Sequence, residues 1–369
     1  MPKPKTCQTT VTGGCLLMLT SPVVWALDWR LDAEWEASRQ DTVSAPLALI
    51  DARPFAWTQR YDLSLADAGA GLDVRFEPEN SGPSEPEWTV RQAYYDTGLG
   101  DYEVTLGQKH LHWDYGFLAN PLNWVGPADG RSEFLAEPLV SVQQFRGIST
   151  DQAVCTLRLE NQQGLCLVRT QGFSGAVDWQ VAAGYEAGWQ LGAGASWVPG
   201  QRWEYHGSLT WYEAALQRSY RNGRLLTEHE SAWNILVGAS TSGQGGWQLL
   251  LEHHLDTRAL SADDWSQVRQ DLEAEADGAL ASAWQGEPLT AHRSLVRLTQ
   301  NWNDWDLTGA LIGLWAGEPT ALTELELTYA WTQSAALTLG WQTTPASGML
   351  GQIGRGDRYT LGVNWVLAP

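Results

Sequence analysis

The charged residues that could do chemistry lie inside alternating segments, where apolar residues separate them. Arg30 and Glu34 alternate with Leu31, Ala33 and Trp35, so one face of an extended strand would be polar and the other apolar. Facing water, opposed rows of guanidinium and carboxylate groups create a transverse field that orients dipolar solutes and selects by charge. If the polar faces line a water-filled pore, we expect the lining to comprise Arg30, Glu34, Arg60, Asp62, Asp73, Arg75, Arg91, Glu103, Lys109, Arg297 and Arg358.

Arginine suits such a lining because its guanidinium stays ionised and binds carboxylate groups through two parallel hydrogen bonds. For any single member of the set, the alternative is an ion pair with a neighbouring acid. Such a pair would only neutralise the interior of a small, plugged barrel. The sequence does not decide between the two roles residue by residue, but the set as a whole favours a pore lining.

Histidines provide the best candidates for a metal site. His110 and His112 are alternate residues that would share one face of a strand, and Asp114 lies two positions further on. The spacing fixes no third ligand, and the adjacent His253 and His254 would point to opposite faces. No motif places a serine beside a histidine and an orienting group, as nucleophilic hydrolysis requires. We therefore expect no metal site, no cofactor and no enzymatic activity.

Cys155 and Cys166 are the two cysteines beyond the N-terminal segment. They flank Asn161-Gln-Gln-Gly164, and pairing across that turn would place them at comparable positions on two short strands. Export would place them in an oxidising compartment, where disulfides form. The sequence therefore favours a structural disulfide that braces a hairpin, with two free thiols as the alternative.

Residues 1–26 have the features of a secretory signal peptide. Lys3 and Lys5 make the beginning basic, an apolar stretch follows, and Val24 and Ala26 lie at the −3 and −1 positions of a cleavage site. The alternative is a disordered N-terminus. Cleavage would leave a mature chain of residues 27–369, which we expect to form a single domain.

The charge balance excludes one class of partner, because a formal net charge of −20 leaves no basic face for nucleic acid. The longest apolar run of the mature chain, residues 309–316, is too short to cross a bilayer as a helix. A soluble β protein and a transmembrane β-barrel would both satisfy that constraint.

Hydrophobicity alternates with a period of two along nearly the whole mature chain, and the 22 Trp residues concentrate at the ends of the alternating segments. Trp189 and Trp197 enclose one such segment, and Tyr359 and Trp365 enclose another, with Gly and aliphatic residues between them. Aromatic girdles around an aliphatic band are typical of barrels in the outer membrane. The pattern predicts an all-β fold, an antiparallel transmembrane β-barrel of about 16–18 strands. A soluble sandwich or propeller is the alternative, although no repeat of blade length is present.

Two long connections interrupt the strands. Residues 114–138 are rich in Pro, Gly and Asn and would form a loop that either folds inward to narrow the pore or stays exposed. Residues 256–288 form the second loop, which we expect to contain a short helix capped by Ser261 and Asp264, either as a lid or plug or as decoration. Short strands near 68–77 and 138–172 are ambiguous in register.

Several segments resemble blocks of proteobacterial outer-membrane porin-like families, including the alginate-export type and related barrels of unassigned function. The matching segments are Val90-Arg-Gln-Ala-Tyr-Tyr95, Leu106-Gly-Gln-Lys-His110, Trp113-Asp-Tyr-Gly116, Asn120-Pro-Leu-Asn123 and the C-terminal stretch 348–365. They cover a small part of the chain and are structural, so the resemblance implies a barrel with a pore and says little about the solute. The ending Leu367-Ala-Pro369 departs from the terminal aromatic residue of such barrels.

From these features we expect a channel in the bacterial outer membrane that passes small hydrophilic solutes or anionic saccharides without an energy source. Its partners would be membrane lipid and the solute, and assembly into a homo-oligomer stays open. The alternative is a non-conducting surface barrel that acts as a receptor, adhesin or assembly partner, with its lumen filled by side chains and the helix-bearing loop.

Overall fold

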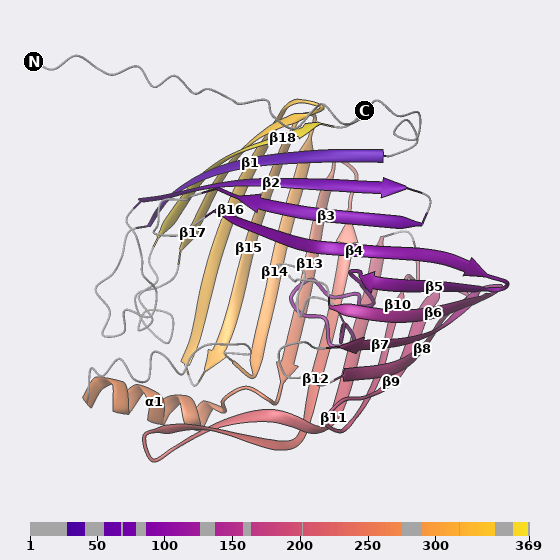
Figure 1. The fold of residues 1–369 in the computed structure, drawn as a ribbon. Coiled ribbons are helices and arrows are strands. Elements are labelled where there is room, and N and C mark those ends of the chain that lie inside the picture. Colours follow the sequence, from indigo (N-terminus) through magenta and orange to yellow (C-terminus); the bar gives the residue numbers. More distant parts are fainter. Residues whose placement is uncertain are drawn as a thin grey trace, which may run out of the picture.

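The computed structural model describes residues 28–40, 55–67, 69–78, 86–125, 137–157, 164–200, 202–274, 290–316, 318–343 and 357–367. These residues form an 18-stranded antiparallel sheet and a helix, α1 (Figure 1). The strands are β1 Asp28–Gln40, β2 Phe55–Asp67, β3 Ala70–Glu77, β4 Glu87–Leu99, β5 Tyr102–Gln108, β6 Pro138–Arg146, β7 Ser149–Leu157, β8 Gly164–Ser174, β9 Val177–Tyr185, β10 Trp189–Trp197, β11 Trp203–Arg221, β12 Arg224–Ser242, β13 Trp247–Asp256, β14 His292–Trp302, β15 Trp305–Ala316, β16 Glu318–Thr332, β17 Ala335–Thr343 and β18 Arg358–Leu367. Helix α1 spans Ala262–Ala274.

Each strand pairs with its neighbours in the sequence, and the sheet closes on itself where β1 pairs with β18. This closing register runs from Leu31 opposite Leu367 to Gln40 opposite Arg358. Closure leaves no strand edge unpaired, which is the condition for a sheet to lie in hydrocarbon. The predicted antiparallel barrel is therefore confirmed, and the segments of ambiguous register become β3, β6, β7 and β8.

The period of two divides each strand between the outside of the barrel and the lumen. In β10, Trp189, Leu191 and Trp197 point outward and are about half exposed, whereas Gly192 and Gly194 point inward. The same division puts an apolar belt around the outside, with Val, Leu and Ala in the middle of the strands and Trp and Tyr near their ends. A water-soluble protein does not expose so large an apolar surface.

The connections at the two ends of the barrel differ in length. Strands joined by mostly short turns meet at one end, called here the short-turn end, where β1 begins and β18 ends. The strand ends that residues 41–54, 109–137, 257–291 and 344–357 separate in the sequence meet at the opposite end, called here the long-loop end. One tight turn at the long-loop end is Asn222-Gly223, where both residues have positive φ, as a type I′ hairpin turn requires. It joins β11 to β12, and Figure 1 shows this long hairpin beside α1.

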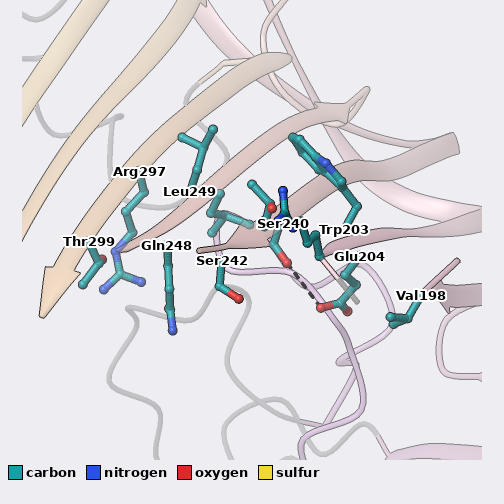
Figure 2. A pocket seen from close by; sticks show the side chains of 12 residues that line it. Val198, Trp203, Glu204, Ser240, Ser242, Gln248, Leu249, Arg297 and Thr299 are labelled. Carbon is teal, nitrogen blue, oxygen red and sulfur yellow. Dashed lines mark hydrogen bonds between the residues drawn. The ribbon is translucent and has the colours of Figure 1, made fainter. Parts of the chain in front are cut away.

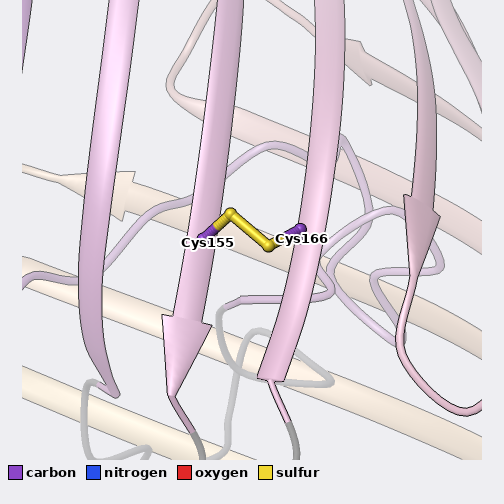
Figure 3. Close-up of a disulfide and its surroundings, with 2 residues drawn as sticks. All are labelled: Cys155 and Cys166. Atoms are coloured by element: carbon purple, nitrogen blue, oxygen red, sulfur yellow. A yellow bond between two sulfur atoms is a disulfide. The ribbon is translucent and has the colours of Figure 1, made fainter.

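Cys155 on β7 and Cys166 on β8 lie directly opposite each other and are joined by a disulfide (Figure 3). Both side chains belong to the outward face, because Val154, Thr156, Leu165 and Leu167 between and beside them are buried on the inward face. The disulfide therefore links adjacent strands on the outside of the barrel, near its long-loop end.

Two buried apolar clusters lie inside the barrel. One surrounds Leu122 and Trp124, and the other contains Trp265 and Val268 of α1. Both depend on segments outside the strands: residues 109–125, called here the inserted loop, and the helix-bearing connection. None of the described helices has the length and apolar character needed to cross a membrane.

Candidate functional site

The inserted loop enters the lumen and lies against the inward faces of β6–β13. Its apolar half consists of Trp113, Leu122, Trp124 and Val125, which are buried against inward-facing side chains of β6–β8, namely Leu139, Val154, Leu165 and Leu167. This contact explains why these strands carry leucine and valine on a face that would otherwise meet water. The loop narrows the lumen from one side.

Glycines on β9 and β10 provide the space for this docking. A Cβ atom at Gly192 would lie 2.3 Å from Leu122 Cδ2 and 3.0 Å from Trp124 Cζ2. A Cβ atom at Gly194 would lie 2.7 Å from Leu122 Cδ1. The inward glycines of β10 therefore form a shallow recess that the leucine and the tryptophan fill.

Two buried carboxylates hold the backbone of the inserted loop. Glu252 of β13 is fully buried, and its oxygens accept hydrogen bonds from the amides of Phe117, at 2.9 Å, and Leu118, at 2.5 Å. His206 of β11 contacts the same carboxylate through Nε2 at 3.0 Å. Because an unsatisfied buried amide costs about 1–3 kcal/mol, Glu252 is the principal polar anchor of the loop tip.

Asp114 is the second anchor and belongs to the loop itself. Its Oδ1 accepts a hydrogen bond from the Tyr115 amide at 2.8 Å, and Oδ2 accepts from the Leu122 amide at 2.7 Å and from Ser208 Oγ at 3.1 Å. Burial raises the pKa of Asp114 above its ordinary value, and the three hydrogen bonds lower it only in part.

Side chains of the wall and of the loop itself donate hydrogen bonds to two carbonyls of the inserted loop. Thr210 Oγ1 donates to the Pro121 carbonyl at 2.7 Å, and the Trp124 indole donates to the same carbonyl at 2.9 Å. The side-chain amide of Gln180 donates to the Trp113 carbonyl. The loop therefore has hydrogen-bond partners on β9, β11 and β13, as buried backbone requires.

Beyond the loop tip, the described residues leave space in the lumen along β14–β18 and β1, called here the open cavity. A cavity of about 380 Å³ lies there, bordered on one side by Phe117 of the loop. Its polar wall consists of Glu36, Arg297, Thr308, Glu324, Glu326, Gln342, Arg358 and Thr360. Three carboxylates and two guanidinium groups therefore face this space.

A second cavity, of about 390 Å³, lies along β11–β14 toward the short-turn end (Figure 2). Figure 2 shows Arg297 and Thr299 on one side of it and Glu204, held by a hydrogen bond from Ser240, on the other. Arg297 lines both cavities, and its guanidinium lies over the Phe117 ring, 4.5 Å from the ring centre. Arg297 therefore lies between the two cavities, whereas Phe117 borders only the first.

Several charged residues of β1–β4, together with Lys109 just after β5, form ion pairs on the inner wall, called here the β1–β5 cluster. Arg75 binds Asp62 with two hydrogen bonds, of 2.7 and 2.9 Å. Arg60 binds Glu34 at 2.9 Å and Glu77 at 3.3 Å. These contacts neutralise much of the charge of this wall, so its field in the lumen is weaker than the number of charges suggests.

Other members of the cluster continue the same pairing. Arg91 lies 3.6 Å from an oxygen of Asp62 and 4.0 Å from one of Asp73. Lys109, at the start of the inserted loop, binds Asp96 at 2.5 Å.

Besides Arg297, three of the expected pore-lining residues lie outside this cluster. Arg30, near the short-turn end, is more than half exposed and pairs with Asp32 at 2.8 Å. Glu103 is half buried on the inward face of β5. Arg358 pairs with Glu36 at 2.9 Å across the closing strands.

Helix α1 covers an apolar part of the lumen at the long-loop end. Trp265 and Val268 pack against Leu295, Ile312 and Leu322, which point inward from β14, β15 and β16. Leu118 of the inserted loop and Tyr220 of β11 belong to the same cluster. The helix and the inserted loop are therefore packed together, and α1 covers another part of the same β14–β16 wall that borders the open cavity.

The expected capping of α1 is present, with Ser261 Oγ accepting from the Asp264 amide at 3.1 Å and Asp264 Oδ2 accepting from the Ser261 amide at 3.1 Å. Tyr220 ties the helix to β11, because its amide donates to Asp264 at 2.9 Å and its hydroxyl donates to Asp271 at 2.8 Å.

Among the residues of this site that sequence patterning missed are His206, Glu252, Phe117, Glu324 and Glu326. Alternation does place Glu252 on the face opposite Leu249 and Leu251, but nothing in the sequence shows that a loop amide meets it there. Among the described residues, no group of three or more His, Cys, Asp or Glu side chains is arranged to hold a metal ion.

Neither a family model nor a curated protein matches the sequence. Solved structures do match the fold. OccK11 (OpdR) of Pseudomonas aeruginosa aligns with a TM-score of 0.59 at 9% identity, over 93% of this chain and 96% of that one. OccAB1 of Acinetobacter baumannii aligns with a TM-score of 0.57 at 9% identity, over 93% and 96%. A mutant of Rhodopseudomonas blastica porin gives 0.51 at 10% identity, over 92% and 100%. At these identities the likeness concerns the porin-like barrel fold.

Proposed function

We propose that this protein is a porin-like channel of the bacterial outer membrane that passes small hydrophilic solutes passively. The observation that carries this proposal is that two cavities with polar side chains in their walls lie inside the barrel beside the inserted loop and share Arg297 in their linings. The apolar belt outside would face lipid, and the long-loop end would face the cell exterior, as is usual for outer-membrane barrels. Passage by diffusion needs no cofactor, energy source or catalytic residue.

The charges of the open cavity favour cations over anions. Glu36, Glu324 and Glu326 face it together with Arg297 and Arg358, so carboxylates outnumber guanidinium groups. The arginines of β1–β5 add little, because each has carboxylate neighbours on the same wall. We therefore place small neutral or cationic solutes first.

Anionic saccharides are the second solute class, and their support is the sequence resemblance to the alginate-export type. An anionic chain would need guanidinium groups that do not already serve a carboxylate. In the open cavity Arg297 contacts Phe117, whereas Arg358 binds Glu36. Passage of anionic saccharides would therefore depend mainly on the guanidinium of Arg297.

Single-channel conductance of the folded barrel in a planar bilayer, under a salt gradient, tests the proposal. We expect discrete conductance steps and a reversal potential of the sign that indicates cation preference. Partial block by a charged oligosaccharide but not by its neutral counterpart would instead select the anionic class. The protein with Arg297→Gln is the matched variant, because it removes the guanidinium that lines both cavities and leaves the β1–β5 ion pairs intact.

A folded barrel that never conducts would overturn the channel proposal. Heat-modifiable migration in gels would show that such a sample is folded. The helix-bearing connection already covers part of the lumen at the long-loop end, so a fully closed lumen would point to a surface receptor, adhesin or assembly partner.

A further inference from the structure

Two histidines that are distant in the sequence meet on the outward face of the barrel. His253 lies on β13 and His292 is the first residue of β14, and both side chains are exposed. Their rings are 5.6 Å apart between centres and inclined by 31°. Neither residue takes part in the lumen described above, because Glu252 and His254, the chain neighbours of His253, point inward.

The distance between the two imidazoles suits a metal ion. His253 Nε2 and His292 Nδ1 are 3.5 Å apart, which is long for a hydrogen bond. Zinc binds histidine nitrogens at about 2.0–2.1 Å, so two nitrogens at a tetrahedral angle would be separated by about 3.4 Å. The two nitrogens therefore lie where an ion between them would hold both, with little side-chain movement.

A hydroxyl group supports the orientation that such a site needs. Ser294 lies opposite His253 in the sheet, and its Oγ is 2.9 Å from His253 Nδ1. If Nδ1 carries the proton and donates to this oxygen, the lone pair of Nε2 faces His292. Metal-bound histidines almost always donate their other ring N–H to an oxygen in this way.

The position on the barrel gives the pair access to water and ions. His292 is paired with Trp315, whose indole donates to Ser294 Oγ at 3.4 Å. Trp315 belongs to the aromatic girdle at the long-loop end, and such girdles lie at the level of the lipid headgroups. The ion would therefore not need to enter the hydrocarbon layer, and water could complete its coordination.

We propose that His253 and His292 form a binding site for a divalent transition-metal ion such as Zn²⁺ or Cu²⁺, with Ser294 as the residue that orients His253. This site is separate from the channel, so conductance and metal binding can each fail without the other. The ligand atoms are His253 Nε2 and His292 Nδ1.

Copper titration of the folded, untagged barrel in detergent tests the proposal, with electron paramagnetic resonance as the readout. We expect one equivalent of tightly bound Cu²⁺ whose spectrum shows two nitrogen ligands. Zn²⁺ should compete for the same equivalent, as isothermal titration calorimetry would measure. Either His253→Gln or His292→Gln should remove the two-nitrogen signal, and Ser294→Ala should weaken binding by roughly tenfold or more.

The control variant is His229→Gln, which removes another exposed histidine, on β12, and should leave binding unchanged. The four substituted side chains, His253, His292, Ser294 and His229, all lie on the outward surface. Heat-modifiable gel migration should therefore be the same for every variant and show that each is folded. The proposal is overturned if the wild-type protein takes up no stoichiometric ion, or if the double variant His253→Gln with His292→Gln keeps the two-nitrogen spectrum.

Discussion

The inward faces of β6–β13 lie under the inserted loop, whereas the inward faces of β14–β18 border the open cavity. On the covered wall, the inward positions hold glycines, hydroxyls and a buried carboxylate, as at Gly192, Thr210 and Glu252. On the open wall, outside the part of β14–β16 that α1 covers, they hold side chains that water can reach, as at Glu326 and Arg358.

This difference follows from what each wall must meet. A loop that enters a lumen brings amides and carbonyls, which need partners, and apolar side chains, which need space. A wall that meets water needs neither, so it can carry charged side chains that solutes reach, as at Glu326. The same alternating pattern therefore provides docking positions for the inserted loop on the covered wall, and side chains that select solutes by charge on the open wall.

The largest effect is expected from removing the anchor of the covered wall. Glu252→Ala would leave the amides of Phe117 and Leu118 without an acceptor, at a cost of about 1–3 kcal/mol for each buried amide. The loop tip should detach, and single-channel recordings should show larger, noisier conductance. Glu326→Ala on the open wall is the control and should leave the channel size unchanged. Equal conductance in the two variants would contradict the anchoring role of Glu252.

The next effect is steric and acts on the recess. In Gly192→Ala the added methyl group would overlap Leu122 and crowd Trp124, and overpacking of this kind costs about 1–3 kcal/mol. Protease cleavage within the inserted loop should become faster. The matched variant is Gly362→Ala on β18, where an added Cβ finds no atom closer than 3.7 Å. If both variants resist protease like the wild type, the recess does not position the loop.

The open wall should respond to charge. Removing one carboxylate changes the energy of an ion about 4–8 Å away by about 0.5–1 kcal/mol in water, or roughly two- to fivefold in permeability ratio. Glu324→Gln with Glu326→Gln should therefore shift the reversal potential toward anions. Glu77→Gln in the β1–β5 cluster is the comparison, and it should shift the potential less, because Arg60 and Arg75 already pair with other acids. A larger shift from Glu77→Gln would show that the β1–β5 cluster, and not the open wall, controls the charge selectivity of the channel.

The smallest effect is a pH dependence of loop docking. Burial raises the pKa of Asp114 in the docked loop, so protonation favours the docked state. This contribution is fully present below the ordinary pKa of an aspartate and is lost as the pH rises through the raised value. Openings to a larger conductance should therefore become rarer as the pH is lowered toward about 4. Asp114→Asn should remove that trend, and a trend that persists in this variant must come from another group.

The sequence predicted the fold because the alternation within each strand shows which of its side chains face outward and which face the lumen. Alternation in segments such as β10 and β18 needs no knowledge of neighbouring strands, and the aromatic residues at their ends indicate two membrane interfaces. The capping pair Ser261 and Asp264 is also local, which is why the helix could be expected close to its observed bounds.

The partners of the inward side chains could not be predicted in this way. Arg75 and Asp62 are 13 residues apart and meet through the register of β2 and β3, and Glu252 is more than 130 residues from the amides that it binds. Register depends on turn geometry and on the closure of the whole sheet, so no single segment contains it.

The sequence by itself determined which face of each strand meets lipid and which meets the lumen, since side-chain direction in a strand follows directly from residue parity. Only the tertiary structure decided which lumen charges neutralise one another, which wall the inserted loop covers, and that His253 meets His292. These contacts join residues distant in the chain, and their distances exist only once the barrel has closed.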